Sequence, residues 1–177
     1  MSAAVRRVAV VTGAAGGLGG GIVAELARQG WSVAAGWHRQ APGGVEGDVV
    51  AVPLDVTDDA SIQQAINGVL ERWGRIDLLV NNAGIAGSKA ALFGFTQSLS
   101  RELGSRDIRV NAISPGFLPT ALVGDLTEAQ RAVHASANTL GRLNDIAEVA
   151  RFVAFLAGMR NVSGQVFQLD SRITPWS

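Results

Sequence analysis

Hydrophobic and polar positions follow two periods along this chain, one typical of buried strands and the other of amphipathic helices. Short continuous apolar runs such as residues 8–11 predict strands that are buried on both faces. Between these runs, apolar residues recur at helical spacing, most clearly over residues 62–73, where polar residues fill the opposite face. The pattern predicts strands at 8–11, 31–36, 49–54, 76–80, 108–113 and 165–169, and helices at 22–29, 62–73, 88–103, 127–137 and 145–157.

This alternation of strands and helices predicts the α/β class, in which helices cover both faces of a mostly parallel sheet. No repeat and no linker interrupts the pattern, so we expect residues 1–177 to form a single domain. Ligands of such sheets bind beyond the carboxyl ends of the strands. Functional residues are therefore expected in the turns that follow the strands, at residues 12–21, 37–40, 55–58, 81–87 and 114–120.

The turn after the first strand is rich in glycine and leads directly into a helix. It reads TGAAGGLG over residues 12–19. Glycines allow a backbone to turn tightly and to approach a pyrophosphate, which then lies at the N-terminus of the following helix. The turn predicts a dinucleotide site that includes Gly13, Gly17, Leu18 and Gly19; the alternative is a turn that is merely flexible.

The end of the second strand is expected to contact the ribose of such a dinucleotide, about 20 residues beyond the glycines. His38 and Arg39 occupy this position, and no acidic residue lies between Glu25 and Glu46. An acidic residue there would bind the 2′-hydroxyl of NAD, whereas an arginine pairs with the 2′-phosphate of NADP. We therefore predict NADP(H) as the cofactor, with Arg39 as the phosphate ligand; the alternative for Arg39 is a solvated surface residue.

The balance of charges narrows the classes of partner. The chain has 177 residues, with 15 Lys and Arg against 15 Asp and Glu. A net charge of zero argues against binding to nucleic acid or to an acidic membrane surface, because such proteins need a basic surplus. No apolar run approaches the ~18 residues of a membrane span, and no secretory signal is recognisable. We expect a cytoplasmic protein without nucleic-acid or membrane partners.

The residue types that are absent restrict the chemistry. The chain has no cysteine, which excludes disulfides, a thiol nucleophile and cysteine-ligated zinc. Its two histidines, His38 and His134, are too few for a multi-histidine metal site, so we expect no metal. His134 is interpreted as a surface residue on a helix. The chain has no tyrosine, and Lys89 is its single lysine.

Taken together, the motifs resemble those of the short-chain dehydrogenase/reductase family, and of its 3-ketoacyl reductase branch in particular. The resemblance implies a Rossmann-like, doubly wound parallel sheet. Its other motifs are the DV pair at 55–56, which resembles the adenine contact, NNAG at 81–84, NAISPGFLPT at 111–120, which resembles the loop that meets the nicotinamide carboxamide, GRL at 141–143 and SGQ at 163–165. With His38 and Arg39, the cofactor contacts expected on this basis are Gly13, Gly17, Leu18, Gly19, Asp55, Val56, Asn82, Ala83, Gly84, Lys89, Pro115, Gly116 and Thr120.

One segment departs from the family's pattern. The family's active site is a Tyr-x-x-x-Lys pair, with a Ser on the preceding strand and an Asn on the helix before it. Here SKAALFGFT at 88–96 looks like the segment that begins just before that Lys, yet Ile85 stands four places before Lys89. The resemblance implies that the segment bearing the Asn, the Ser and the Tyr is missing. Lys89 is then the one catalytic residue that remains; the alternative is an ordinary surface lysine.

Loss of one helix–strand unit from a run of right-handed crossovers leaves a right-handed crossover. The helix from Ser88 would connect the fourth strand directly to the strand at 108–113, and we expect it to bury Leu92, Phe95, Leu99 and Leu103. We predict a sheet of six strands, one fewer than the family's usual seven. The segment between the second and third strands is also too short for the helix that the family has there.

Three functions are compatible with these features. The first is a protein that binds NADP(H) but is catalytically incomplete alone, with a full-length paralogue or a second copy as its partner. The second is an active NADPH-dependent oxidoreductase of ketoacyl or other carbonyl compounds, with Lys89, or a water held by Ser114 or Thr120, as a substitute acid. The third is a non-functional, truncated remnant. If the chain is active, its substrate is a small molecule or an acyl chain on a carrier protein or coenzyme A.

Overall fold

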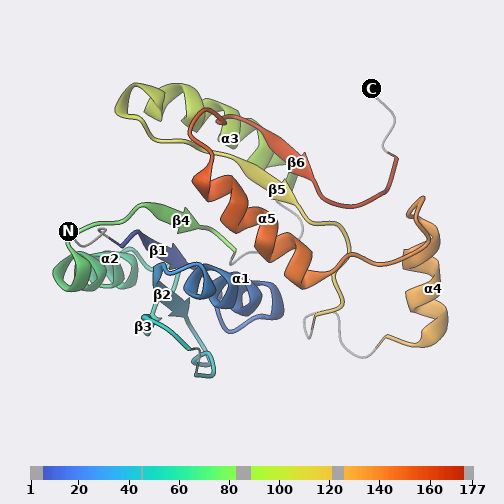
Figure 1. The fold of residues 1–177 in the computed structure, drawn as a ribbon, viewed down its shortest axis with the longest axis horizontal. Helices are drawn as coiled ribbons and strands as arrows, with labels where there is room; N and C mark the ends of the chain where they lie inside the picture. The colour runs from blue at the N-terminus through green and yellow to red at the C-terminus, as the bar shows by residue number, and fades with distance from the viewer. Residues whose placement is uncertain (1–5, 45, 83–88, 121–125, 174–177) are drawn as a thin grey trace. The chain divides into compact units, whose positions relative to one another are not determined.

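The computed structural model describes residues 6–44, 46–82, 89–120 and 126–173 of the chain. They fall into two compact units, which are best seen one at a time in Figure 1. The first unit comprises Met1–Gly84 and Ala150–Ala157, and the second comprises Ile85–Val149 and Gly158–Ser177.

The first unit is a four-stranded parallel sheet with its helices. Its strands pair in the order β3-β2-β1-β4, so that β1 lies between β2 and β4, where the direction of the crossovers reverses. Its elements are β1 (Val8–Val11), α1 (Gly17–Arg28), β2 (Ser32–Trp37), β3 (Val49–Pro53), α2 (Asp59–Trp73) and β4 (Leu78–Val80), and it includes the middle of α5 (Ile146–Gly158).

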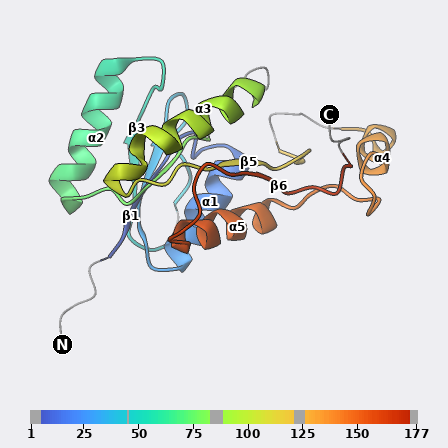
Figure 2. The ribbon, with the colours of Figure 1, turned by 90° about the horizontal axis from the view of Figure 1, so that it is seen from above.

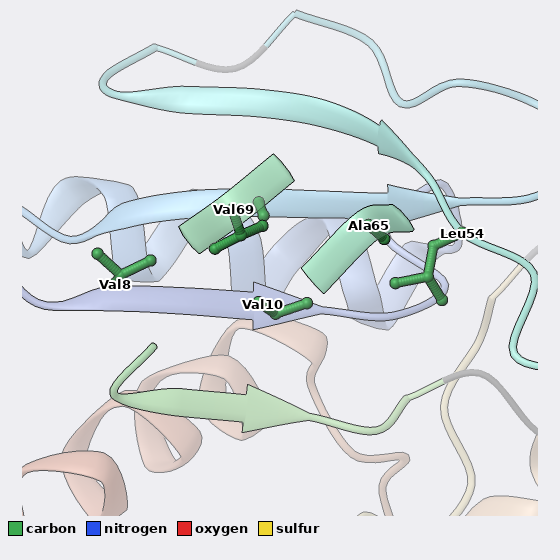
Figure 3. Close-up of a cluster of buried hydrophobic side chains, with 6 residues drawn as sticks. Val8, Val10, Leu54, Ala65 and Val69 are labelled. Carbon is green, nitrogen blue, oxygen red and sulfur yellow. The ribbon is translucent and has the colours of Figure 1, made fainter. Parts of the chain in front are cut away.

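The core of the first unit lies on both faces of β1, because successive side chains of a strand point to opposite faces. Val8 and Val10 pack on one face with Leu54 and with Ala65 and Val69 of α2, as Figure 3 shows. In the same view α1 covers the opposite face, and its buried side chains are Ile22, Val23 and Leu26. The apolar run at residues 8–11 is therefore a buried strand, as predicted.

The second unit is built around a two-stranded parallel sheet. Its elements are α3 (Lys89–Leu103), a 3₁₀ turn (Gly104–Arg106), β5 (Ala112–Ser114), α4 (Glu128–Ser136), β6 (Val166–Gln168) and the two ends of α5. β5 and β6 lie side by side in Figure 2, and Ile113 is in register with Phe167. Thr127 begins α4 with a capping box, in which it exchanges hydrogen bonds with Gln130.

The predicted α/β class and the types of the elements are confirmed. Six strands are found among the described residues, but they form sheets of four and two rather than one sheet of six. β4 and β5 are three-residue strands, and each pairs with one partner inside its own unit. No helix is found between β2 and β3 in the described residues there, as expected. The organisation as a single domain stays a prediction.

Two local predictions are wrong. Residues 108–111 are not a strand, because Val110 N donates to Ser163 Oγ and the side chain of Asn111 bonds to the loop before β6. These contacts with a distant loop take the place of a ladder. Phe95 is 59% exposed rather than buried. Both Phe95 and Thr96 lie at helical spacing from Leu99, and it is Thr96 that is buried.

Candidate dinucleotide site at the carboxyl edge of the sheet

The predicted site residues of the first unit meet at one edge of the four-stranded sheet. The four strands are parallel, so their carboxyl ends share this edge. Thr12 follows β1, His38 and Arg39 follow β2, and Asp55 and Asn82 each come two residues after β3 and β4. The edge includes the point between β1 and β4 where the crossovers reverse, which is where open α/β sheets bind ligands.

The glycine turn leads into α1, whose N-terminus has no side-chain cap. Gly13 has a φ of 64°, in the left-handed region that favours glycine. Gly16 is the N-cap of α1 and makes no side-chain cap hydrogen bond, and the first turn contains no acidic residue. The first N–H groups of a helix, here those of Gly17 and Leu18, lack acceptors within the helix. With the helix dipole they favour an anion at this position.

Asn82 holds the glycine turn against the end of β4. Its side-chain nitrogen donates to the carbonyl oxygens of Thr12 and Gly13, both at 3.1 Å, and its backbone N–H donates to Thr12 Oγ1 at 3.0 Å. Gly19 lies so close to this contact that a Cβ there would overlap Gly13 O and lie 2.7 Å from Asn82 Nδ2. The role of Asn82 in bracing the turn, and the part of Thr12, were not foreseen from the sequence.

His38 and Asp55 pair at the part of this edge where the sequence predicts the ribose to bind. His38 Nδ1 lies 3.2 Å from Asp55 Oδ2, and the two side chains are 54% and 30% exposed. Hydrogen bonds from the backbone and hydroxyl of Thr57, and then the charges of His38 and Arg39, hold the pKa of Asp55 below its ordinary value. Arg39 and Val56 are exposed. The predicted ribose and adenine residues are thus neighbours at the end of β2 and β3.

In the second unit, the loop after β5 carries three of the predicted residues. Gly116 has a φ of 73°, and a Cβ there would overlap the carboxylate of Asp170. Asn144 Nδ2 donates to Pro115 O at 2.6 Å and to the carbonyl oxygen of the residue after β6 at 2.7 Å. Thr120 is half-buried, and its N–H donates to a carbonyl two residues before it. The support from Asn144 and Asp170 had no signal in the sequence motifs.

Three further predicted residues lie wholly or partly outside the described part of the chain. Ala83 and Gly84 lie outside the described residues. Lys89 is the first residue of α3, and its side chain also lies outside the description.

His134 differs from its interpretation as a surface residue. Its ring stacks on that of Phe117, with centroids 3.9 Å apart and an angle of 11° between the planes. His134 is half-buried. The two residues come from a loop and from α4, so no local spacing could have indicated their contact.

The described parts of the chain contain neither a candidate metal site nor a candidate membrane span. No group of three or more His, Asp or Glu residues is arranged there to hold a metal ion. No helix in those parts has both the length and the apolar character needed to cross a lipid bilayer.

Comparison with known proteins agrees with this geometry. The family profile described as short chain dehydrogenase matches residues 7–88, and the one described as enoyl-(acyl carrier protein) reductase matches residues 86–172. The chain is 31% identical to the 3-oxoacyl-[acyl-carrier-protein] reductase of Pseudomonas aeruginosa, over 85% of this chain and 90% of that protein. The chain belongs to the short-chain dehydrogenase/reductase family.

Other members of the family resemble the chain over similar lengths. The 3-oxoacyl-[acyl-carrier-protein] reductase of Thermotoga maritima is 29% identical over 93% of this chain and 96% of that protein. That alignment runs over 237 positions, more than the 177 residues of this short-chain dehydrogenase/reductase, so the relative carries residues that this chain lacks. A solved short-chain dehydrogenase/reductase from Serratia marcescens superposes with a TM-score of 0.83 at 25% identity, covering 94% of this chain and 98% of that one.

Proposed function

We propose that this chain binds NADP(H) at the carboxyl edge of its four-stranded sheet and is catalytically incomplete on its own. The observation that carries the binding proposal is the start of α1, where a glycine N-cap leaves the first N–H groups without a side-chain partner. A pyrophosphate fits there, because the backbone is glycine-rich and no acidic residue in the first turn would repel it. Membership of the family supports a nicotinamide cofactor.

Arg39 supports NADP(H) over NAD(H). It is exposed directly beyond β2, where the ribose of a bound dinucleotide is expected. Its positive charge acts on the pKa of Asp55, so it lies at the same edge of the sheet. A guanidinium pairs with a phosphate through charge-assisted hydrogen bonds, which a 2′-hydroxyl cannot match. When bound, NADPH would supply the hydride for carbonyl reduction.

The proposal that the chain is catalytically incomplete rests on the lack of a proton donor. Reduction of a carbonyl needs a hydride on the carbon and a proton on the oxygen, and in the family a tyrosine donates that proton. This chain contains no tyrosine. Two findings support loss of the segment that bears it next to residue 85: the two family profiles meet at residues 86–88, and the Thermotoga relative carries residues that this chain lacks. We therefore infer a partner role beside a full-length paralogue that acts on ketoacyl substrates.

Thermal unfolding with each coenzyme tests the binding proposal. A ligand at a hundred times its dissociation constant adds about 2.7 kcal/mol to the free energy of unfolding. For a chain of this size the melting temperature would rise by roughly 5–10 °C. We expect this rise with NADP(H), a smaller one with NAD(H), and loss of the difference in Arg39→Gln. Arg160→Gln, which removes an exposed arginine of the second unit, is the matched control. No rise with either coenzyme would refute the proposal.

Activity and co-purification test the incompleteness and the partner role. The purified chain should not oxidise NADPH with a 3-ketoacyl thioester, and it should form a stable complex with a full-length paralogue when the two are co-expressed. Turnover at an ordinary enzymatic rate by the purified chain would contradict incompleteness. In that case Lys89→Ala would show whether Lys89 is the substitute acid. A chain that stays separate from every paralogue would contradict the partner role.

A further inference from the structure

The two edge strands of the four-stranded sheet are protected against further pairing to different degrees. β3 and β4 lie at the two ends of its strand order. Leu54 N donates to Trp37 O in β2, so the preceding residue, Pro53, faces the open side of β3 and has no N–H to offer there. Proline blunts an edge in this way. β4 reads LLV over residues 78–80 and contains neither a proline nor a charged residue, so its edge is not blunted by either.

The backbone of Leu79 points to the open side of β4. Thr12 N donates to Val80 O at 3.0 Å, so the carbonyl of Val80 faces β1. Successive residues of a strand direct their N–H and C=O groups to opposite sides. The N–H and C=O of Leu79 therefore face away from β1, on the side where the described residues place no further strand of this sheet.

The side chain of Leu79 is also incompletely covered. Leu79 is in register with Val10, which packs on the face of the sheet that α2 covers. Its side chain lies on that same face, because residues paired in a parallel ladder project to one side. Leu79 is nevertheless 51% exposed. An antiparallel strand beside β4 would satisfy the backbone of Leu79 and remove apolar surface from water at the same position.

The sequence around Leu79 is complementary to itself in the antiparallel direction. With a twofold axis at Leu79, this residue faces its own counterpart, and each N–H donates to the other C=O. Leu78 then faces the second copy's Val80, which pairs two apolar residues on the other face. Asp77 faces the second copy's Asn81, so no like charges are opposed. The carboxylate of Asp77 is already bonded to Val8 N and to Arg75 within the chain.

We propose that two copies of this chain associate through antiparallel pairing of their β4 strands, which joins two four-stranded sheets into one continuous sheet. β4 has three residues, so the interface is small and the dimer is reversible. The twofold arrangement closes on itself and leaves no second β4 edge for growth of a filament. The inference is independent of the proposed coenzyme site.

Cysteine cross-linking of the full-length chain tests the position of the axis. The chain has no cysteine, so a single introduced thiol reports on one site. Opposed residues of a hydrogen-bonded antiparallel pair have Cα atoms about 5.5 Å apart, within the range of roughly 4.4–6.8 Å that a disulfide spans. Leu79→Cys should therefore form a covalent dimer under mild oxidation. Ala51→Cys is the matched control, because Ala51 is an exposed residue of β3, the opposite edge strand.

Sedimentation equilibrium over a range of concentrations tests the contacts themselves. Leu79→Lys places like charges opposite each other, and Leu79→Pro removes a donor from the proposed interface but none from the ladder with β1. We expect each variant to weaken self-association at least about tenfold, the effect of losing roughly 1.4 kcal/mol. Ala51→Lys should leave it unchanged. Thermal unfolding of each variant shows whether it is folded, and Leu79→Lys keeps the test decisive if Leu79→Pro is not.

Three results would overturn the inference. The first is a chain that stays monomeric at every concentration and shows no cross-link at position 79. The second is equal cross-linking of Leu79→Cys and Ala51→Cys, which indicates random collision. The third is self-association that folded Leu79→Lys leaves intact, which assigns the dimer to another surface. A cross-link confined to position 79, together with a dimer weakened by Leu79→Lys, would support pairing through β4.

Discussion

Replacement of Gly19 by alanine is the sharpest probe of the glycine turn. Gly19 is the third residue of α1, and its backbone approaches the turn that precedes the helix. A Cβ at this position would overlap Gly13 O and would lie 2.9 Å from Gly13 C and 2.7 Å from Asn82 Nδ2. Two of these three atoms belong to the backbone, so no side-chain rotation relieves the overlap. The turn itself would have to move.

Two opposing effects determine how far Gly19→Ala lowers the free energy of unfolding. Overpacking of this kind costs typically ~1–3 kcal/mol, whereas alanine in place of glycine within a helix stabilises by roughly 0.5–1 kcal/mol. We expect the free energy of unfolding of Gly19→Ala to fall by about 1–2 kcal/mol, because rigid backbone atoms put the overpacking in the upper part of its range. At roughly 2–4 °C for each kcal/mol in a chain of this size, the melting temperature should fall by about 2–8 °C.

The neighbouring glycine supplies the control. A Cβ at Gly20 would meet only Ala14 O, at an ordinary contact distance of 3.4 Å. Gly20→Ala should therefore melt at or slightly above the temperature of the unsubstituted chain. Thermal unfolding and calorimetric titration with NADP⁺ would be measured for both variants, and only Gly19→Ala should lose affinity as the turn is displaced. A Gly19→Ala variant that is as stable as Gly20→Ala would refute the reasoning.

Three further changes test other contacts. Asn82→Ala removes two hydrogen bonds to the glycine turn, one of them to Gly13 O, and should lower the free energy of unfolding by about 1–3 kcal/mol in urea titrations. Hydrogen bonds from the side chains of Arg28 and then Gln29 lower the pKa of Glu25 from its ordinary 4.5 to about 2. The ionised Glu25 therefore stabilises the fold fully above pH 4.5, and this stabilisation is lost as the pH falls toward 2. Glu25→Gln should therefore be less stable than the unsubstituted chain near neutral pH, and a difference that did not shrink in acid would contradict this. Asn144→Ala frees the loop after β5, so hydrogen exchange should accelerate at residues 112–120 and not in β1, and unchanged exchange in the loop would argue against the tie.

Features with a local cause were predictable from the sequence. A continuous apolar run suffices to identify β1, because a strand that is buried on both faces needs an apolar side chain at every position. α2 has a clear apolar stripe, and it ends at Gly74, whose φ of 74° needs no information from other parts of the chain. The glycine turn was recognisable for the same reason, since its backbone conformation depends on the residues within it.

Features that depend on distant contacts were not predictable. Phe95 and Thr96 fit the apolar spacing of α3 equally well, and only the packing of the second unit selects Thr96 for burial. The extended stretch before β5 bonds to the loop before β6, about fifty residues further along the chain, instead of joining a ladder. His134 gains its stacked partner Phe117 in a similar way.

For the candidate site the division is the same. The sequence by itself determined which chemical groups are present, namely the glycine turn and the basic residues after the second strand, and that tyrosine is absent. Composition and short motifs are properties of the linear sequence and do not depend on how the chain folds. Tertiary structure decided how these groups are used. Asn82 braces the turn, and the side chains of Asp55 and His38 lie next to each other. The physical reason is that these contacts form across a parallel sheet, where the pairing of strands brings together residues from distant parts of the chain.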